Sequence, residues 1–117
     1  MDAAQAIADL TDISPQVQRV AVIAADGSII GSNVGAEAAR RLADGARALV
    51  DTAAELRPDV AQLEAATLSG SVFVVRDGDR LIAATTTPEP TVGLVFYDLK
   101  TCVRSIGEQK KAKDAAA

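Results

Sequence analysis

The sequence predicts one domain of the α/β (α+β) class, a three-layer α/β/α arrangement around a five-stranded, mostly antiparallel sheet. Its 117 residues can build one hydrophobic core but are too few for two ordinary domains. Helical and extended apolar patterns follow one another in the order α-β-β-α-β-β-β-α. Several of the extended runs are apolar on both faces, so helices must cover both sides of the sheet.

The amino-terminal third predicts a helix followed by a pair of strands. Apolar residues recur at helical spacing over residues 2–12, which indicates a short helix. Residues 17–25 then form an extended run with apolar side chains on both faces. Asp26-Gly27 favours a tight hairpin turn, because glycine adopts the left-handed torsions of such turns without strain. Residues 28–32 are therefore the returning strand.

A helix of about six turns is expected between Gly35 and Leu56, where no proline interrupts the pattern. Its apolar arc has two parts. The leucine stripe consists of Leu42, Leu49, Ala53 and Leu56. The alanine row, beside it, consists of Ala39, Ala43, Ala46 and Val50. We expect the leucine stripe to cover the sheet, which leaves the alanine row as apolar surface for a second helix.

Three extended runs after Pro58 predict a β-meander, and they cover residues 60–68, 71–76 and 80–87. Ser69-Gly70 and Asp77-Gly78-Asp79 supply the turns between them. The last two runs are apolar on both faces and belong in the middle of the sheet, whereas Gln62 and Glu64 place the first near an edge. The aspartate turn lacks the other ligands of a calcium-binding loop, so a hairpin turn is the stronger interpretation.

Helical spacing returns after Pro88 and Pro90 and predicts a last helix from Thr91 that packs on the sheet. Beyond Gly107 the chain carries charged residues and alanines without a packing face. We therefore expect a single domain over residues 1–107 and a disordered tail over residues 108–117.

The composition excludes most catalytic sites. The chain has no histidine and a single cysteine, so it cannot form a Ser/His/Asp triad, a Cys/His dyad or a histidine metal site. Cys102 falls on the apolar stripe of the last helix, where a buried structural thiol is a stronger interpretation than a nucleophile. The sequence contains no glycine-rich loop followed by a lysine, the motif that binds the phosphates of a nucleotide. We expect no enzymatic activity, no cofactor and no metal.

Charge and hydropathy limit the surroundings of the protein. A formal net charge of −4 provides no basic field for nucleic acid. The apolar stretches are shorter than the ~20 residues of a membrane helix, and the amino terminus does not have the pattern of a secretory leader. We expect no membrane insertion and a reducing compartment, most simply the cytoplasm.

The alanine row is the feature that points to a partner. We expect Ala39, Ala43, Ala46 and Val50 to form a dimer interface, with a second copy or with a related chain. Gln62 and Glu64 belong to the same expected interface, because an edge strand can extend its sheet by pairing with its own copy. Two alternatives stay open: these polar residues protect the edge instead, and the row reflects only the high alanine content.

Two segments resemble the Roadblock/LC7 family, the dynein light-chain-like domains that include bacterial partners of small Ras-like GTPases. They are VQRVAVIAADGSIIGSN and, after the long helix, LEAATLSGSVFVVRDGDRLIAATTTPEPTVGLVFYDL. The resemblance implies a profilin-like fold in which the strand pair joins the meander between strands one and five. It also implies dimers in which the long helices pair and the third strands meet. The implied partner is a GTPase, in bacteria sometimes together with a sensor kinase.

In the family that the sequence resembles, some members alter nucleotide hydrolysis or exchange in their GTPase partner, and others only act as a scaffold for it. We expect a noncatalytic regulator or adaptor whose partner-binding residues lie on the charged face of the long helix. This charged face consists of Arg40, Arg41, Asp44, Arg47 and Asp51. Arg40/Asp44 and Arg47/Asp51 are each four residues apart, so we expect them to be charge neighbours. A solvated surface without a partner is the alternative interpretation of this face. One alternative is a dimeric hub that brings signalling or motor components together without sensing nucleotide. A small-molecule sensor with a pocket under the sheet is a third.

Overall fold

The computed structural model describes the backbone of residues 1–116 and the side chains of residues 1–106. The elements in chain order are α1 (Ala3–Ile13), β1 (Val17–Ile23), β2 (Ile29–Ser32), α2 (Ala36–Leu56), β3 (Gln62–Thr67), β4 (Gly70–Asp77), β5 (Arg80–Thr86) and α3 (Val92–Ala116). The five strands form one sheet in the order β2-β1-β5-β4-β3, and every neighbouring pair is antiparallel. The predicted fold class and element order are confirmed.

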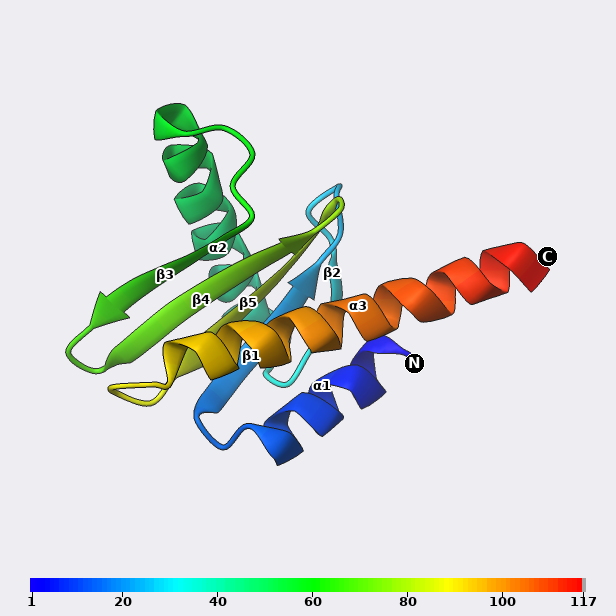
Figure 1. Cartoon of the computed structure of the whole chain (residues 1–117), viewed down its shortest axis with the longest axis horizontal. Helices are drawn as coiled ribbons and strands as arrows, with labels where there is room; N and C mark the ends of the chain where they lie inside the picture. The colour runs from blue at the N-terminus through cyan, green and yellow to red at the C-terminus, as the bar shows by residue number, and fades with distance from the viewer. Residues whose placement is uncertain (117) are drawn as a thin grey trace.

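Helices cover both faces of this sheet, with α2 on one side and α1 and α3 together on the other (Figure 1). Side chains of β1 point alternately to the two faces of the sheet, so both faces need a covering of helices. Val20 and Val22 belong to the core under α1 and α3, whereas Ile23 belongs to the core under α2. All three side chains are at most 1% exposed. The doubly apolar strand therefore has the double covering that its sequence predicts.

The edges and turns of the sheet also follow the sequence. The central positions of β4 and β5 are confirmed, and β3 is an edge strand. It is shorter than the apolar run that predicted it, because Val60, Ala61 and Leu68 lie outside the ladder. The chain passes from β3 to β4 through Leu68-Ser69, and Gly70 follows with a φ of +139°.

The two terminal helices are anchored by specific polar contacts. The Asp2 side chain caps α1 by accepting a hydrogen bond of 2.8 Å from the backbone N–H of Gln5. The loop before α3 is tied to the start of β1, because the backbone N–H of Thr91 donates to the Gln16 side-chain oxygen at 2.6 Å. The backbone of α3 stays helical to Ala116, and Ile106 is the last of its residues whose side chain the structure describes. The domain limit at residue 107 and the disordered tail stay predictions, and Ala117 lies outside the described residues.

Candidate functional site

The face that α2 turns towards the sheet is the alanine row. Ala39, Ala43, Ala46 and Val50 are all at most 2% exposed within a single chain. Three of them pack in one cluster with Val74, Leu81 and Ala83 of the sheet. The prediction that the leucine stripe covers the sheet and the alanine row is free for a partner is therefore wrong. The short alanine side chains let the helix backbone approach the strands closely, which displaces the longer leucines to the flank.

The leucine stripe lies at the border of this packing. Leu42 and Leu49 are partly buried beside the core under α2, and Leu56 is 82% exposed. These leucines belong to a heptad row, in which the spacing alternates between four and three residues. The heptad row consists of Ala38, Leu42, Gly45, Leu49, Thr52 and Leu56. Such spacing produces a straight seam for a second helix, and its small members allow a close approach.

The same border continues onto the sheet. Leu63 of β3 and Val72 of β4 are only partly buried, and both pack against the core under α2. Leu63 pairs with Val74 across the β3–β4 ladder, so it shares the face that α2 covers elsewhere. We call Leu42, Leu49, Leu56, Leu63 and Val72 the open apolar face. It was missed in the sequence because the leucines were assigned to the interior.

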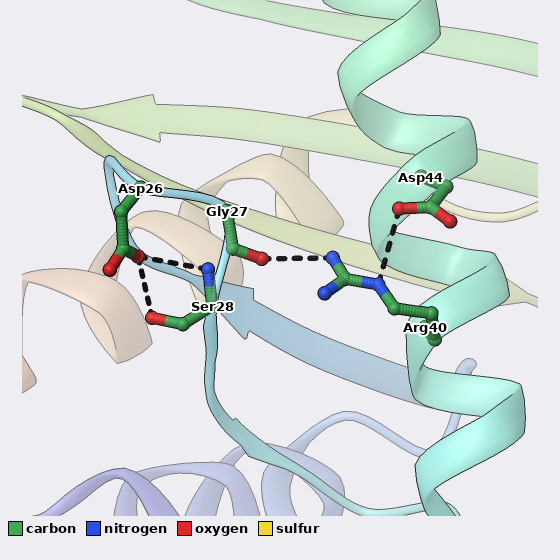
Figure 2. Close-up of polar contacts among 5 residues, drawn as sticks. All are labelled: Asp26, Gly27, Ser28, Arg40 and Asp44. Carbon is green, nitrogen blue, oxygen red and sulfur yellow. Dashed lines mark hydrogen bonds and ion pairs between the residues drawn. The ribbon is translucent and has the colours of Figure 1, made fainter.

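The charged face of α2 begins with a contact that supports the fold (Figure 2). The guanidinium of Arg40 donates a hydrogen bond of 2.8 Å to the carbonyl oxygen of Gly27, in the β1–β2 turn. Its Nε lies 3.2 Å from the Asp44 carboxylate, so the predicted Arg40–Asp44 pair is confirmed. Arg40 thereby holds the strand pair against α2, which is a structural task for a residue predicted to bind a partner.

Hydrogen bonds within the β1–β2 turn fix the position of the carbonyl group that Arg40 contacts. The Ser28 hydroxyl donates to the Asp26 carboxylate at 2.6 Å, and the Ser28 backbone N–H donates to the same oxygen at 2.9 Å (Figure 2). These bonds lower the pKa of Asp26, the hydroxyl contributing most and the backbone N–H next. The turn therefore presents the Gly27 carbonyl to α2 in one orientation.

Arg41, Arg47 and Asp51 are the remaining members of the charged face. Arg41 lies 3.9 Å from Glu37, and both side chains are more than four-fifths exposed. Among the described side chains no ion pair joins Arg47 to Asp51, contrary to the expected charge neighbours. Arg47 instead borders a polar hollow of about 220 Å³ with Arg76 and Asp79 at the tip of the β4–β5 hairpin. The sequence did not single out Arg76, because it lies 29 positions from Arg47.

The two edge residues predicted for the dimer interface lie on β3. Gln62 is exposed, whereas Glu64 is partly buried and accepts a hydrogen bond of 2.8 Å from the Ser71 hydroxyl. Their partners in the ladder are Val75 and Phe73, so both point to the α1 and α3 side of the sheet. The backbone of β3 has one partner, β4, and its other side is the sheet edge.

The described residues offer little for catalysis or metal binding. Cys102 is buried, and burial raises the pKa of its thiol to about 11, with a smaller contribution from the Asp9 carboxylate. A thiol with this pKa stays protonated at neutral pH, as expected of a structural cysteine. Within the described part of the chain, no three acidic or cysteine side chains cluster as metal ligands. None of its helices is both long and apolar enough to cross a bilayer.

Comparison with known proteins identifies the architecture. No family model matches the sequence, and no curated protein matches it significantly. A Roadblock/LC7 domain from Streptomyces avermitilis superposes with a TM-score of 0.81 at 18% identity, over 95% of this chain and 99% of the other. For MglB from Myxococcus xanthus the TM-score is 0.75 at 15% identity, over 94% and 88%.

A third structure, described as MglB with tetrameric arrangement, superposes with a TM-score of 0.69 at 13% identity, over 91% of this chain and 85% of the other. The similarity spans the three helices and five strands rather than one motif. At these identities it is a likeness of fold. The chain therefore has the fold of Roadblock/LC7 domains, the family that its strand and turn pattern resembles.

Proposed function

We propose that two copies of this chain, or one copy and a related chain, associate through the open apolar face. The observation that carries the proposal is the unfinished covering of the core under α2. Leu56 is 82% exposed, and Leu42, Leu49, Leu63 and Val72 are only partly buried where they pack against that core. A second α2 laid along the heptad row would remove these side chains from water.

The edge strand β3 adjoins this face and supports the same arrangement. Its free backbone groups can pair with the β3 strand of a second copy across a two-fold axis. Gln62 and Glu64 then lie at the junction, whereas the alanine row stays inside each chain. The proposed interface thus includes the predicted edge residues of β3, but on α2 it uses the leucines of the open apolar face instead of the alanine row.

Replacing Leu56 by glutamate should weaken the dimer, because each of the two copies loses a buried leucine. The expected loss is about 3 kcal/mol, roughly a hundredfold in the dissociation constant. Sedimentation equilibrium measures it, with Leu94→Glu as the control because Leu94 is a half-exposed leucine of α3 on the other side of the sheet. Equal dissociation of both variants, or of neither, would contradict the interface.

Gly45 offers a second variant that separates association from folding. A Cβ added to Gly45 meets nothing within 4 Å in the single chain. Gly45→Ala should therefore stabilise the monomer by up to about 1 kcal/mol through helix propensity. In the dimer the same methyl group would separate two closely packed helices. Weaker association together with a higher melting temperature is the expected result.

We further propose that the dimer binds a small Ras-like GTPase as a noncatalytic regulator or adaptor in the cytoplasm, in some settings together with a sensor kinase. The resemblance to Roadblock/LC7 domains supports this partner class. The charged face supplies ionic side chains that a partner can contact, since Arg41 and Asp51 are exposed and Arg47 is partly exposed beside the polar hollow. Binding regulates the GTPase only if the affinity differs between its two nucleotide states.

A binding measurement decides between regulator and hub. A small Ras-like GTPase from the same genome is loaded with GDP or with a non-hydrolysable GTP analogue and titrated with the protein in a calorimeter. We expect the two affinities to differ at least tenfold, and Arg47→Glu to weaken the tighter complex by about tenfold. Arg104→Glu, on exposed α3, serves as the control. Equal affinities would instead indicate a dimeric hub, and no binding would overturn the GTPase proposal.

A further inference from the structure

A groove runs between α1 and α3, on the opposite side of the sheet from the open apolar face. It has a volume of about 110 Å³. Its walls are mainly apolar, with Ala6 and Leu10 from α1 and Cys102 from α3. Ile13, at the end of α1, also borders it and is 64% exposed. The groove is thus an apolar slot with an exposed aliphatic side chain at its rim.

One acidic side chain in this groove is unusual. Asp98 borders the groove and is 7% exposed, and among the described side chains none forms a hydrogen bond or ion pair with its carboxylate, which keeps slight contact with solvent. Burying a carboxylate without a compensating partner is costly. A positively charged group placed in the groove would supply the missing partner.

The hydroxyl groups that border the groove already have hydrogen-bond partners, so the carboxylates are the groups that can pair with a bound cation. The hydroxyl of Thr101 donates to the Tyr97 carbonyl oxygen at 3.0 Å, and that of Ser105 donates to the Cys102 carbonyl oxygen at 2.7 Å. Both hydroxyls are therefore satisfied within α3. Asp9 borders the groove as a second carboxylate, and α1 contains two aspartates and neither lysine nor arginine. Two carboxylates and one ammonium group, that of the Met1 amino terminus, belong to residues that border the groove, so its local charge is negative.

We propose that the α1/α3 groove is a docking site for an amphipathic helix of a partner protein, which inserts one arginine or lysine towards Asp98. The aliphatic part of such a side chain fits the apolar walls while its charged end pairs with the carboxylate. Leu94 and Tyr97 lie one helical turn before Asp98 and Thr101 on α3, are 49% and 67% exposed, and offer apolar contacts to the same helix. This site lies away from the charged face of α2, so it does not depend on the proposed GTPase binding.

The proposal can be tested with two probes by ¹H–¹⁵N NMR on the full chain. N-butylguanidinium imitates the arginine side chain, and n-butanol is its uncharged control. An amphipathic helical peptide with one arginine in a leucine face imitates the partner, and its control carries glutamate in place of arginine. We expect saturable shifts of the Ala6, Leu10 and Cys102 amide signals with both cationic probes and with neither control.

The variant Asp98→Asn should lower the affinity for both cationic probes at least tenfold. Asp12→Asn is the matched control, because Asp12 is an exposed aspartate of α1 that does not border the groove. Asp98→Asn should also raise the melting temperature without ligand, because the amide removes an unpaired buried charge. Unchanged probe affinity or a lower melting temperature would overturn the role of Asp98. Binding of butylguanidinium without binding of the peptide would overturn the helix as occupant.

Discussion

Replacing Ala46 by glutamate should unfold the domain rather than merely separate two copies of it. Ala46 is 1% exposed and packs in the core under α2 with Val74 and Leu81. A glutamate there introduces an additional methylene group and a carboxylate into close-packed apolar surroundings. No basic residue lies one turn away on α2 to neutralise it. We expect a loss of more than about 4 kcal/mol, comparable with the total stability of a small domain.

Urea unfolding followed by circular dichroism measures this loss, and the dispersion of NMR signals reports whether a folded core remains. Ala48→Glu is the matched control, since Ala48 is exposed on the same helix. It should change the stability by less than about 0.5 kcal/mol. A stable, folded but monomeric Ala46→Glu protein would show instead that the alanine row is the dimer interface.

The alanine row shows where sequence patterns stop being informative. Periodicity identifies which residues of α2 are apolar, and the apolar arc was identified correctly. It does not say which part of a wide arc faces the sheet, because that depends on how closely the helix can approach. Ala39 and Ala43 allow an approach that Leu42 and Leu49 would prevent. Side-chain size, rather than hydrophobicity, decides the orientation here.

The sheet was more predictable because its signals are local. Residues 17–25 show double-sided alternation, and Asp26-Gly27 and Asp77-Gly78-Asp79 mark turns too short for parallel connections. The register of the edge strand β3 was less predictable, since partly buried residues alternate weakly. The α1/α3 groove was not predicted, because the residues that line it on the two helices lie more than 80 positions apart in the chain. A signal existed nevertheless: Asp98 lies one turn from both Val95 and Cys102, on an otherwise apolar stripe.

Substituting Gly70 by alanine should be the most disruptive change in the β-meander. Gly70 has a φ of +139°, a conformation that residues with a Cβ rarely adopt. An added Cβ would also overlap the backbone carbonyl of Thr86, on the neighbouring strand β5. Two rigid strands would have to move apart at the point where β4 begins. We expect a loss of about 3 kcal/mol or more.

The local hydrogen bonds explain why the strands cannot yield easily at this point. The Thr67 hydroxyl donates to the Gly70 carbonyl oxygen at 2.6 Å, and the Ser71 backbone N–H donates to the Thr86 hydroxyl at 3.2 Å. The Thr86 hydroxyl in turn donates to the Thr87 carbonyl oxygen at 3.0 Å. Moving β4 away from β5 would lengthen the bond between Ser71 and Thr86, and a buried backbone group without its partner is costly.

Gly78→Ala separates the two causes of the expected loss. Gly78 has a φ of +60°, but a Cβ added there meets nothing within 4 Å. Its substitution should cost about 1 kcal/mol from backbone strain alone. Thermal and urea unfolding of both variants give the difference, which measures the overlap with Thr86. Equal losses in the two variants would mean that β4 and β5 can separate without cost at Gly70, and the close contact between these strands would then not be a fixed feature of the fold.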